Sequence, residues 1–230
     1  RRRRRGAKRL LVRETSCCAR LGRPRPREPP ARHFRGADPL AKAVHRAATT
    51  PSALAQRFAH ELTQVGGEVV LARSAAEACA ALAKELQTAE RVVSWSRSEL
   101  TDLDLGGVWR DFGARCYEPK DADFRRHLLL ADVGITGVDC AVAETGSLVL
   151  SASPGRPRGV SLLPRLHVAL VRESQLVPRM GLAWPGYPGR LPSAVHFITG
   201  PSRTSDIEND LSIGVHGPAR VLAIVVPEAA

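Results

Sequence analysis

A glycine-containing turn between two apolar segments carries a carboxylate in a position suited to chemistry. Within residues 133–152, two apolar segments that are typical of strands are separated by Glu-Thr-Gly-Ser. In α/β proteins reactive groups lie at strand ends, because the loop exposes the side chain while the sheet fixes its position. Glu144 is therefore a candidate acid or base. The residues expected to adjoin it are Thr136, Thr145, Gly146 and Ser147. A hairpin turn with a solvated glutamate has the same pattern, and the sequence leaves both interpretations open.

A second segment has the residue types of an anion site. Residues 196–210 run from an apolar strand through a loop of glycine, proline and hydroxyl residues into a helix expected to begin near Ser205 and Asp206. Free N–H groups at a helix start, together with hydroxyls and a guanidinium, would hold a carboxylate or phosphate. The candidate anion-binding residues are Thr199, Gly200, Ser202, Arg203, Thr204 and Asp206. The alternative is a capping box from Ser205 to Glu208, in which Asp206 only favours the helix dipole.

One histidine occupies a tight turn. His216 lies in the sequence Gly-Val-His-Gly-Pro, residues 214–218, and its pKa in water suits acid or base work near neutral pH. The imidazole of a turn residue can equally bond the backbone, so His216 is a second candidate catalytic residue and not an assigned one. The remaining histidines are scattered along the chain and read as surface or packed residues.

The signatures of several enzyme and cofactor classes are missing. The chain has no G-x-G-x-x-G, no G-x-x-x-x-G-K-[ST], no G-x-S-x-G and no H-E-x-x-H. Its five cysteines are odd in number and contain no C-x-x-C pair, which argues against a disulfide framework and against a zinc or iron–sulfur site. We therefore expect no metal and no cofactor bound by this chain, and a reducing, cytoplasmic setting.

The first half of the regular region alternates helices and strands. The periodicity predicts a helix over about 51–65 and strands over 68–73, 91–96 and 114–118. A second helix is expected to begin after Ser74, which forms a capping box with Glu77. The inner face of the helix after Ser74 is expected to comprise Ala75, Cys79, Leu82 and Leu86. A further helix is expected to be capped by Asp121, with Phe124, Leu128 and Ala131 facing inward.

The second half is richer in strands. Apolar, β-branched runs joined by Gly/Pro/Ser loops predict strands over 140–143, 147–152, 167–172, 195–199 and 221–226, and residues 180–192 read as a surface excursion. The alternation in the first half together with these runs predicts an α/β fold with a mostly parallel sheet flanked by helices.

The positive charge is concentrated in one arm. Of the 34 Lys and Arg residues, 14 fall within residues 1–35, which carry a balance of +12, whereas residues 36–230 sum to −1. The arm has four prolines and almost no apolar periodicity, so we expect it to be disordered, and we expect residues 36–230 to form the α/β domain.

The arm has three possible interpretations, which are a polyanion-binding tail, a targeting signal, and sequence that is not native to the protein. We favour the last, because the single methionine is Met180 and aromatic residues for base stacking are nearly absent. Nucleic acid is thus an unexpected partner, and no apolar run is long enough for a membrane span.

Five blocks in a fixed order resemble one known family. The blocks comprise residues 134–137, 143–150, 161–171, 198–208 and 214–218. They resemble the lactate utilization protein C family, the LUD domain, over about residues 38–226. The basic arm falls outside the resemblance.

The resemblance implies a fold and a role. It implies a fold similar to that of CoA transferases, ribose-phosphate isomerases and glucosamine-phosphate deaminases, and a part in oxidising L-lactate to pyruvate beside iron–sulfur partner proteins. In the related transferases a glutamate attacks the thioester, and Glu144 is the candidate of that type here. We expect Arg203 and the 199–206 loop to hold a small carboxylate, with Glu144 and His216 facing the same crevice. A non-catalytic partner-docking subunit and a stand-alone transferase or isomerase are the alternatives.

Overall fold

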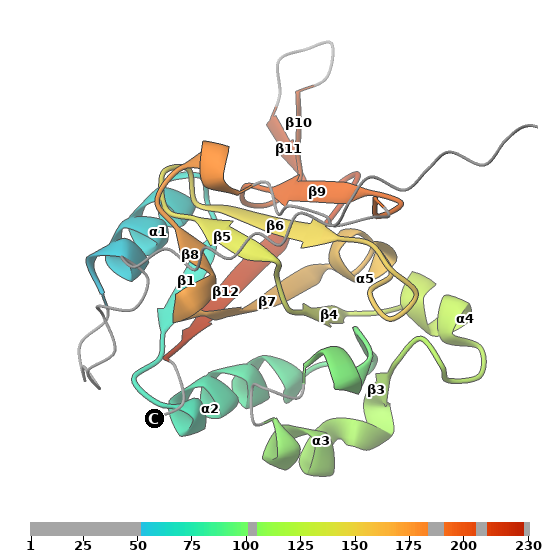
Figure 1. The fold of residues 1–230 in the computed structure, drawn as a ribbon. Coiled ribbons are helices and arrows are strands. Elements are labelled where there is room, and N and C mark those ends of the chain that lie inside the picture. The colour runs from blue at the N-terminus through green and yellow to red at the C-terminus, as the bar shows by residue number, and fades with distance from the viewer. Residues whose placement is uncertain (1–51, 101–104, 184–190, 206–210, 228–230) are drawn as a thin grey trace, which may run out of the picture. The chain divides into compact units, whose positions relative to one another are not determined.

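A six-stranded parallel β-sheet forms the core of the computed structural model (Figure 1). Its strands in spatial order are β1 (Glu68–Leu71), β12 (Arg220–Val226), β7 (Leu166–Arg172), β4 (Val133–Thr136), β2 (Val92–Ser94) and β3 (Cys116–Tyr117). The structure describes residues 52–100, 105–183, 191–205 and 211–227. These belong to one of two units into which the chain divides, residues 46–230 as opposed to 1–45. The basic arm and its expected boundary after residue 35 lie outside the described residues.

A second sheet and a hairpin come from the strand-rich second half. The four-stranded sheet has the order β8 (Leu176–Val177), β5 (Cys140–Val142), β6 (Ser147–Ser151) and β9 (Val195–Ile198). Strand β6 runs antiparallel to both β5 and β9, so this sheet is mixed. A separate antiparallel pair consists of β10 (Arg203–Ser205) and β11 (Leu211–Ile213). The strand-rich character predicted for the second half is confirmed.

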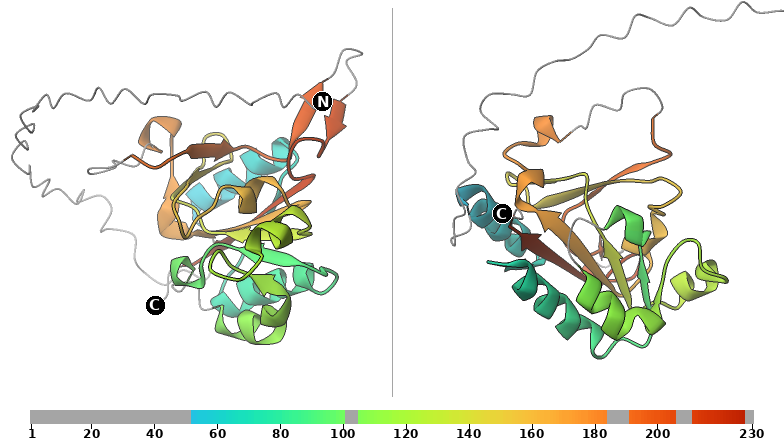
Figure 2. Two further views of the ribbon diagram at one scale, coloured as in Figure 1. Left: turned by 90° about the vertical axis from the view of Figure 1, so that its right-hand side faces the viewer. Right: turned by 60° about the horizontal axis from the view of Figure 1, so that its bottom comes forward.

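Helices and the second sheet cover the two faces of the central sheet. The helices are α1 (Ala53–Gln64), α2 (Ala75–Leu86), α3 (Gly106–Phe112), α4 (Phe124–Leu129) and α5 (Gly159–Leu162). Short 3₁₀ turns are η2 (Arg97–Glu99), η4 (Gly113–Arg115), η5 (Glu173–Gln175) and η6 (Met180–Leu182). Figures 1 and 2 show α2 and α3 on one face of the central sheet, and α1, α5 and the second sheet on the other. The predicted α/β class with a mostly parallel sheet is therefore confirmed.

The first two helices form for the reasons that the sequence shows. The Oγ of Ser52 accepts from the Ala55 N–H at 3.2 Å, and that of Ser74 accepts from the Glu77 N–H at 3.2 Å, so each caps a helix start. The buried face of α1 is Ala55, Phe58 and Leu62, at helical spacing. Helix α2 buries Ala78, Leu82 and Leu86. The predicted inward positions of Leu82 and Leu86 are confirmed, whereas Ala78 is buried in place of Ala75 and Cys79, which are only half-buried.

Other local predictions were wrong in detail. Strand β3 is limited to two residues because Gly113–Arg115 forms a 3₁₀ turn, and α4 starts after Asp123, whose φ is 55° and whose side chain makes no cap. The carboxylate of Asp121 instead accepts from the Glu118 N–H at 2.8 Å. Strands β4 and β8 are additional to those expected. Short elements with few capping and periodicity signals account for these differences.

The strand order creates one place where neighbouring loops diverge. From β2 the chain runs outward through α3 to the edge strand β3, and then returns to β4 on the other side of β2. The segment after β4 leads instead to the second sheet on the opposite face (Figure 1). In open α/β sheets such a switch of direction leaves a crevice outside the carboxyl ends of the two strands.

Candidate functional site

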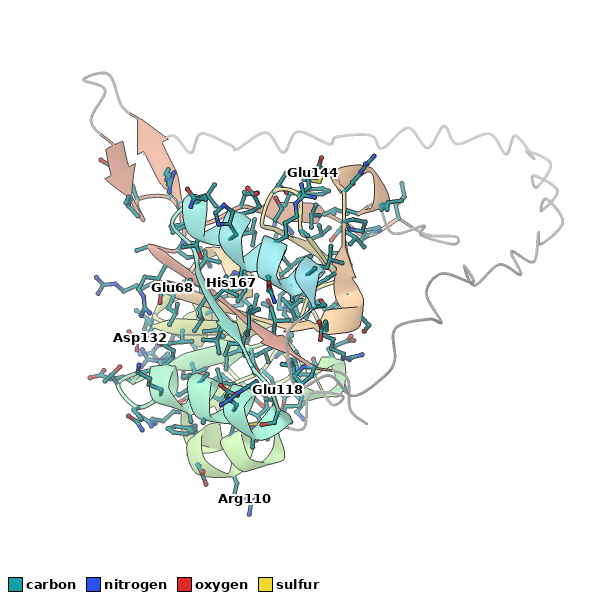
Figure 3. All side chains as sticks on the ribbon, turned by 90° about the vertical axis from the view of Figure 1, so that its left-hand side faces the viewer. Glu68, Arg110, Glu118, Asp132, Glu144 and His167 are labelled. Carbon is teal, nitrogen blue, oxygen red and sulfur yellow. The ribbon has the colours of Figure 1, made fainter. Side chains whose placement is uncertain are left out.

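The Glu144 turn lies on helix α1. Gly146 has a φ of 64°, and a Cβ at that position would lie 2.3 Å from the Leu62 backbone N, so only glycine fits. Glu144 is exposed at the surface of the second sheet (Figure 3), and its Oε2 accepts from the Met180 N–H at 3.0 Å. The carboxylate is therefore accessible, as the sequence predicted, and is also held by a backbone donor.

A chain of hydroxyl contacts connects this turn to the second predicted segment. The Oγ1 of Thr145 lies 2.7 Å from the Oγ of Ser147, and that Oγ lies 2.7 Å from the Oγ1 of Thr199. Residues separated by 52 positions are thus brought together. The crevice predicted to be shared by Glu144, His216 and Arg203 stays a prediction. The hydroxyl groups are paired with one another, so their first role is to join β6 to the end of β9.

The loop after β9 wraps the carboxyl end of α1. Gly200 has a φ of 83°, with Val65 O only 2.6 Å from where a Cβ would stand. A terminal N–H of Arg203 donates to the same carbonyl of Val65. The last carbonyls of a helix have no partner within the helix, and a guanidinium is a suitable donor for them. Arg203 thus closes a helix end, and its remaining N–H groups are exposed.

Of the helix predicted to begin near Ser205 and Asp206, only Ser205 lies within the described residues. Arg203–Ser205 is a β-strand, in which Thr204 pairs with Ser212 and Ser205 with Leu211. A run of hydroxyl and acidic residues favours a hairpin as well as a capping box, and here the strand pairing prevails. Ser205 is therefore a strand residue and not a helix cap, and the rest of the predicted helix start lies outside the described residues. Asp206 lies outside the described residues.

His216 stands beside the same loop. The Ser202 N–H donates to Pro218 O at 2.9 Å, and the Gly214 N–H donates to Ser202 O at 2.9 Å, so the 214–218 turn packs on Ser202. The His216 side chain is exposed. No contact to Glu144 is seen among the described residues, and the joint acid/base role of the two stays a prediction.

Thr136 belongs to the interior and not to the surface turn. Its Oγ1 lies 2.8 Å from the Nε2 of His167 on the neighbouring strand β7, and both side chains are fully buried. Figure 3 labels His167 in the interior of the molecule. Burial lowers the pKa of His167 to about 3, because a desolvated imidazolium is unfavourable. The imidazole is therefore neutral at neutral pH. Its Nδ1 has no hydrogen-bond partner among the described residues.

The structure shows a crevice that sequence reasoning missed. It has a volume of about 150 Å³ and lies at the carboxyl ends of β2, β4 and β7, at the switch of strand direction. Its lining residues are Trp95, Ser98, Glu99, Gly137, Val138, Arg156, Leu170, Arg172 and Gln175. They come from four segments whose proximity depends on the strand order, which no local pattern in the sequence reveals.

The charged side chains of the crevice are held in place. The Nε of Arg156 donates to Glu99 Oε2 at 2.7 Å, and its Nη1 donates to Asp139 Oδ1 at 2.9 Å. The guanidinium also lies 5.1 Å from the ring centre of Trp95, a cation–π distance. On the other side, Gln175 donates to Val138 O at 2.6 Å and accepts from the Arg172 N–H at 2.9 Å. The walls of the crevice are thus fixed before any ligand enters.

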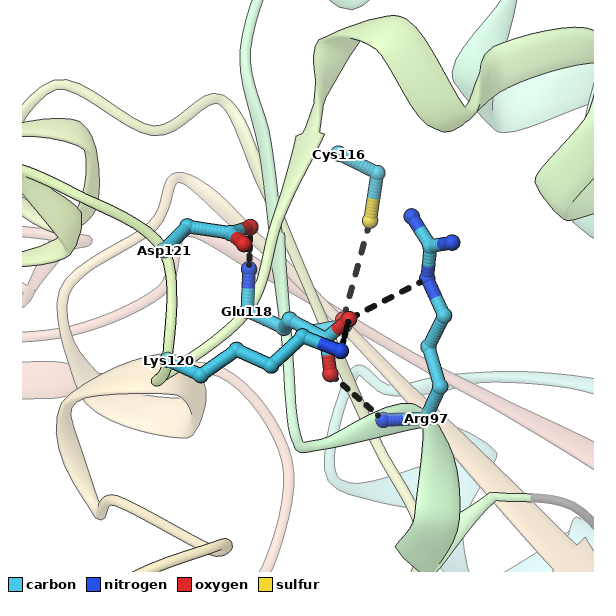
Figure 4. A network of polar contacts seen from close by, with 6 residues as sticks. Arg97, Cys116, Glu118, Lys120 and Asp121 are labelled. Atoms are coloured by element: carbon cyan, nitrogen blue, oxygen red, sulfur yellow. Dashed lines mark hydrogen bonds and ion pairs between the residues drawn. The ribbon is translucent and has the colours of Figure 1, made fainter.

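A buried carboxylate supports the loop that carries Glu99. Glu118 accepts from the Arg97 N–H at 3.0 Å and lies 3.5 Å from Arg97 Nε and 3.2 Å from Lys120 Nζ (Figure 4). These contacts fix the start of η2. Nearby, burial raises the pKa of the Cys116 thiol to about 11, as it does for Cys140, so both thiols are protonated at neutral pH.

Two further searches concern metals and membranes. Across residues 52–100, 105–183, 191–205 and 211–227, no group of three or more His, Cys, Asp or Glu side chains is arranged to hold a metal ion. Within the same ranges no helix has the length and apolarity needed to cross a bilayer.

Comparisons with known proteins place these elements in a family. The chain is 37% identical over 150 residues to "Lactate utilization protein C" of Shouchella clausii, covering 63% of this chain and 66% of that protein. It is 47% identical over 104 residues to the protein of the same name from Halalkalibacterium halodurans, covering 43% of this chain and 45% of that protein. The matched part thus spans about half to two thirds of these relatives.

A solved structure supports the fold. The crystal structure of a DUF162 family protein from Deinococcus radiodurans matches with a TM-score of 0.52 at 24% identity, covering 75% of this chain and 96% of that one. The family model of the LUD domain matches residues 55–226, which contain both sheets and every described helix except the start of α1. The chain belongs to the LUD domain family.

Proposed function

We propose that this chain is a component of an L-lactate utilization system that oxidises L-lactate to pyruvate together with iron–sulfur partner proteins. The observation that carries the proposal is the set of relatives named lactate utilization protein C, at 37–47% identity in the two cases given above. In this proposal the partners accept the electrons, and the present chain binds a small carboxylate.

The exposed carboxylate of Glu144 is the group whose role is most accessible to test. It lies in a turn that is rigidly seated on α1 through Gly146 and is tied to Thr199 through hydroxyl contacts. Its charge is not needed to hold the turn, because an amide oxygen would accept equally well from the Met180 N–H. A glutamine at this position therefore removes the charge and keeps the acceptor.

Glu144→Gln should abolish L-lactate-dependent growth if the carboxylate acts on substrate. The measurement is growth on L-lactate of a strain lacking this protein, restored with the wild-type chain or with the variant at matched expression. Loss of growth by more than about tenfold in rate is expected, since removing a general acid or base lowers rates by about 10²–10⁴.

The control is Glu90→Gln, which removes an exposed carboxylate just before β2 and should restore growth fully. Normal growth with Glu144→Gln would contradict a catalytic role and favour the partner-docking alternative. Normal growth of the strain without any form of the chain would contradict the proposed function itself. Turnover of an acyl-CoA or a sugar phosphate by the purified chain would instead support the stand-alone transferase or isomerase.

A further inference from the structure

We propose that the crevice at the carboxyl ends of β2, β4 and β7 binds a small 2-hydroxy monocarboxylate, with Arg172 facing its carboxylate and Glu99 accepting from its hydroxyl. This inference rests on the proposed function for the choice of L-lactate as the probe, and it places the ligand away from Glu144, so it is an alternative to a direct role of that carboxylate on the substrate. The crevice itself is a site that the sequence-based prediction did not include.

The position of the crevice is the first argument. The loops after β2 and β4 leave the sheet toward opposite faces, and the crevice opens between them. Ligands of open α/β sheets bind at such a point, because the diverging loops leave a gap that is lined by strand ends. The Glu144 turn and the Thr199 loop contribute no residue to its lining.

The size of the crevice is the second argument. A cavity of about 150 Å³ in another protein accepts benzene, a molecule of six heavy atoms. The present crevice has about the same volume, and L-lactate also has six heavy atoms. Pockets for larger ligands measure about 300–1,000 Å³, so a nucleotide or a CoA thioester does not fit inside this one.

The distribution of charge is the third argument. Arg172 ends β7 and Glu99 lies in the turn that follows β2, with β4 between the two strands, so the two side chains line the crevice from opposite sides of β4. A simple anion between them would be attracted by the guanidinium of Arg172 but repelled by the carboxylate of Glu99. A molecule with a carboxylate at one end and a hydroxyl donor at the other satisfies both.

The pairing of Glu99 leaves room for that hydroxyl. Both contacts that Arg156 makes with Glu99 engage the Oε2 atom, at 2.7 Å each. The Oε1 atom is therefore available as an acceptor within the described part of the chain. Gly137 has no side chain to fill the space beside Trp95 and Leu170, which border the crevice and are themselves each only 2% exposed. The crevice thus offers a cation for the carboxylate and an acceptor for the hydroxyl of a small hydroxy acid.

The site is tested first on the wild-type chain. Amide chemical shifts are followed by NMR during titration with L-lactate, and those of Gly137, Val138 and Glu99 are expected to move most. Shifts confined to the 199–204 loop would place the ligand at the anion site predicted from sequence, and would overturn this proposal. No shift anywhere at saturating concentrations would overturn it as well.

The role of the hydroxyl is tested with a matched ligand. Propionate has the carbon chain of lactate without the hydroxyl, and we expect it to bind about tenfold more weakly, because a hydrogen bond to a charged group is lost. Glu99→Leu, which has no acceptor atom, is expected to reduce that ratio toward one. The ratio is measured on the same variant for both ligands, so a general loosening of the crevice does not affect it. Equal binding of the two acids to the wild-type chain would contradict the assignment of Glu99.

The role of the cation is tested in parallel. Arg172→Gln is expected to weaken both acids by about tenfold or more, whereas Arg125→Gln, on the exposed side of α4, is expected to weaken neither. The two proposals fail separately. If L-lactate shifts the crevice resonances but growth on L-lactate does not require the chain, the binding site is supported and the proposed function is contradicted. If growth requires the chain but L-lactate shifts no crevice resonance, the proposed function is supported and the binding site is contradicted.

Discussion

Replacing Gly134 by alanine is expected to lower the free energy of unfolding by about 3 kcal/mol or more. Gly134 lies within β4, near the middle of the central sheet, and an added Cβ would stand 1.9 Å from Val160 O and 2.8 Å from Pro164 Cγ. The first of these atoms is backbone and cannot rotate away, so α5 or the strand itself would have to move. Urea unfolding of the purified chain measures the change.

The matched control is Gly107→Ala. No atom lies within 4 Å of a Cβ at Gly107, which is in helix α3, and alanine in a helix is more favourable than glycine by about 0.5–1 kcal/mol. This variant is therefore expected to be slightly stabilised. Equal behaviour of the two variants would show that α5 does not pack directly on β4.

The close packing at Gly134 also has a functional consequence. Helix α5 follows the loop that carries Arg156, and the Ser96 N–H donates to Gly155 O of that loop at 2.9 Å. A displacement of α5 would therefore move Arg156 relative to Glu99. We expect Gly134→Ala to weaken L-lactate binding in the crevice even under conditions where the chain stays folded.

The sequence predicted the elements whose determinants are local. Helices α1 and α2 follow from apolar residues at helical spacing, and α2 also from the Ser74 cap, whereas the Ser52 cap of α1 was not predicted. The strands of the second half follow from runs of β-branched residues. The burial of Ala78 in place of Ala75 and Cys79 has a physical reason, since the many alanines of α2 and Cys79 are similar in size and leave the edge of the buried face poorly specified.

The features that could not be predicted depend on distant contacts. The strand order decides that Trp95, Gly137 and Arg172 meet at one crevice, and that order is not encoded in any single segment. The 203–205 segment was read as leading into a helix because its hydroxyl and acidic residues suit a cap, while its pairing with 211–213 was not visible locally. Of the predicted site, the hydroxyl contacts between the Glu144 turn and Thr199 are found, whereas Thr136 is a core residue.

Lowering the pH below about 6.5 is expected to destabilise the chain through His167 by about 1.4 kcal/mol per pH unit. Burial lowers the pKa of His167 in the folded chain to about 3, whereas a histidine in the unfolded chain has a pKa near 6.5. Between these values the unfolded state binds one more proton than the folded state, so protonation favours unfolding. The stability that the neutral imidazole provides is fully present above pH 6.5 and is lost as the pH falls toward 3.

The measurement is the free energy of unfolding as a function of pH, compared between the wild-type chain and two variants. His167→Gln removes the titrating group and should reduce the slope of the unfolding free energy against pH by the contribution of about one proton. His60→Gln removes an exposed histidine on α1 and should leave that slope unchanged. Carboxylates also contribute to the slope at low pH, and the comparison between variants subtracts their effect.

A second observation keeps this prediction testable where His167→Gln does not fold. The imidazole proton shifts of His167 should stay constant between pH 8 and about 5, because burial lowers its pKa to about 3. Titration of His167 near 6.5 would mean that water reaches the interior between β4 and β7. In that case the hydrogen-bonded pair of Thr136 and His167 would be accessible to water and would belong to the polar groups at the strand ends. A constant shift would instead establish that this pair holds β4 against β7, the two strands whose ends carry Gly137 and Arg172.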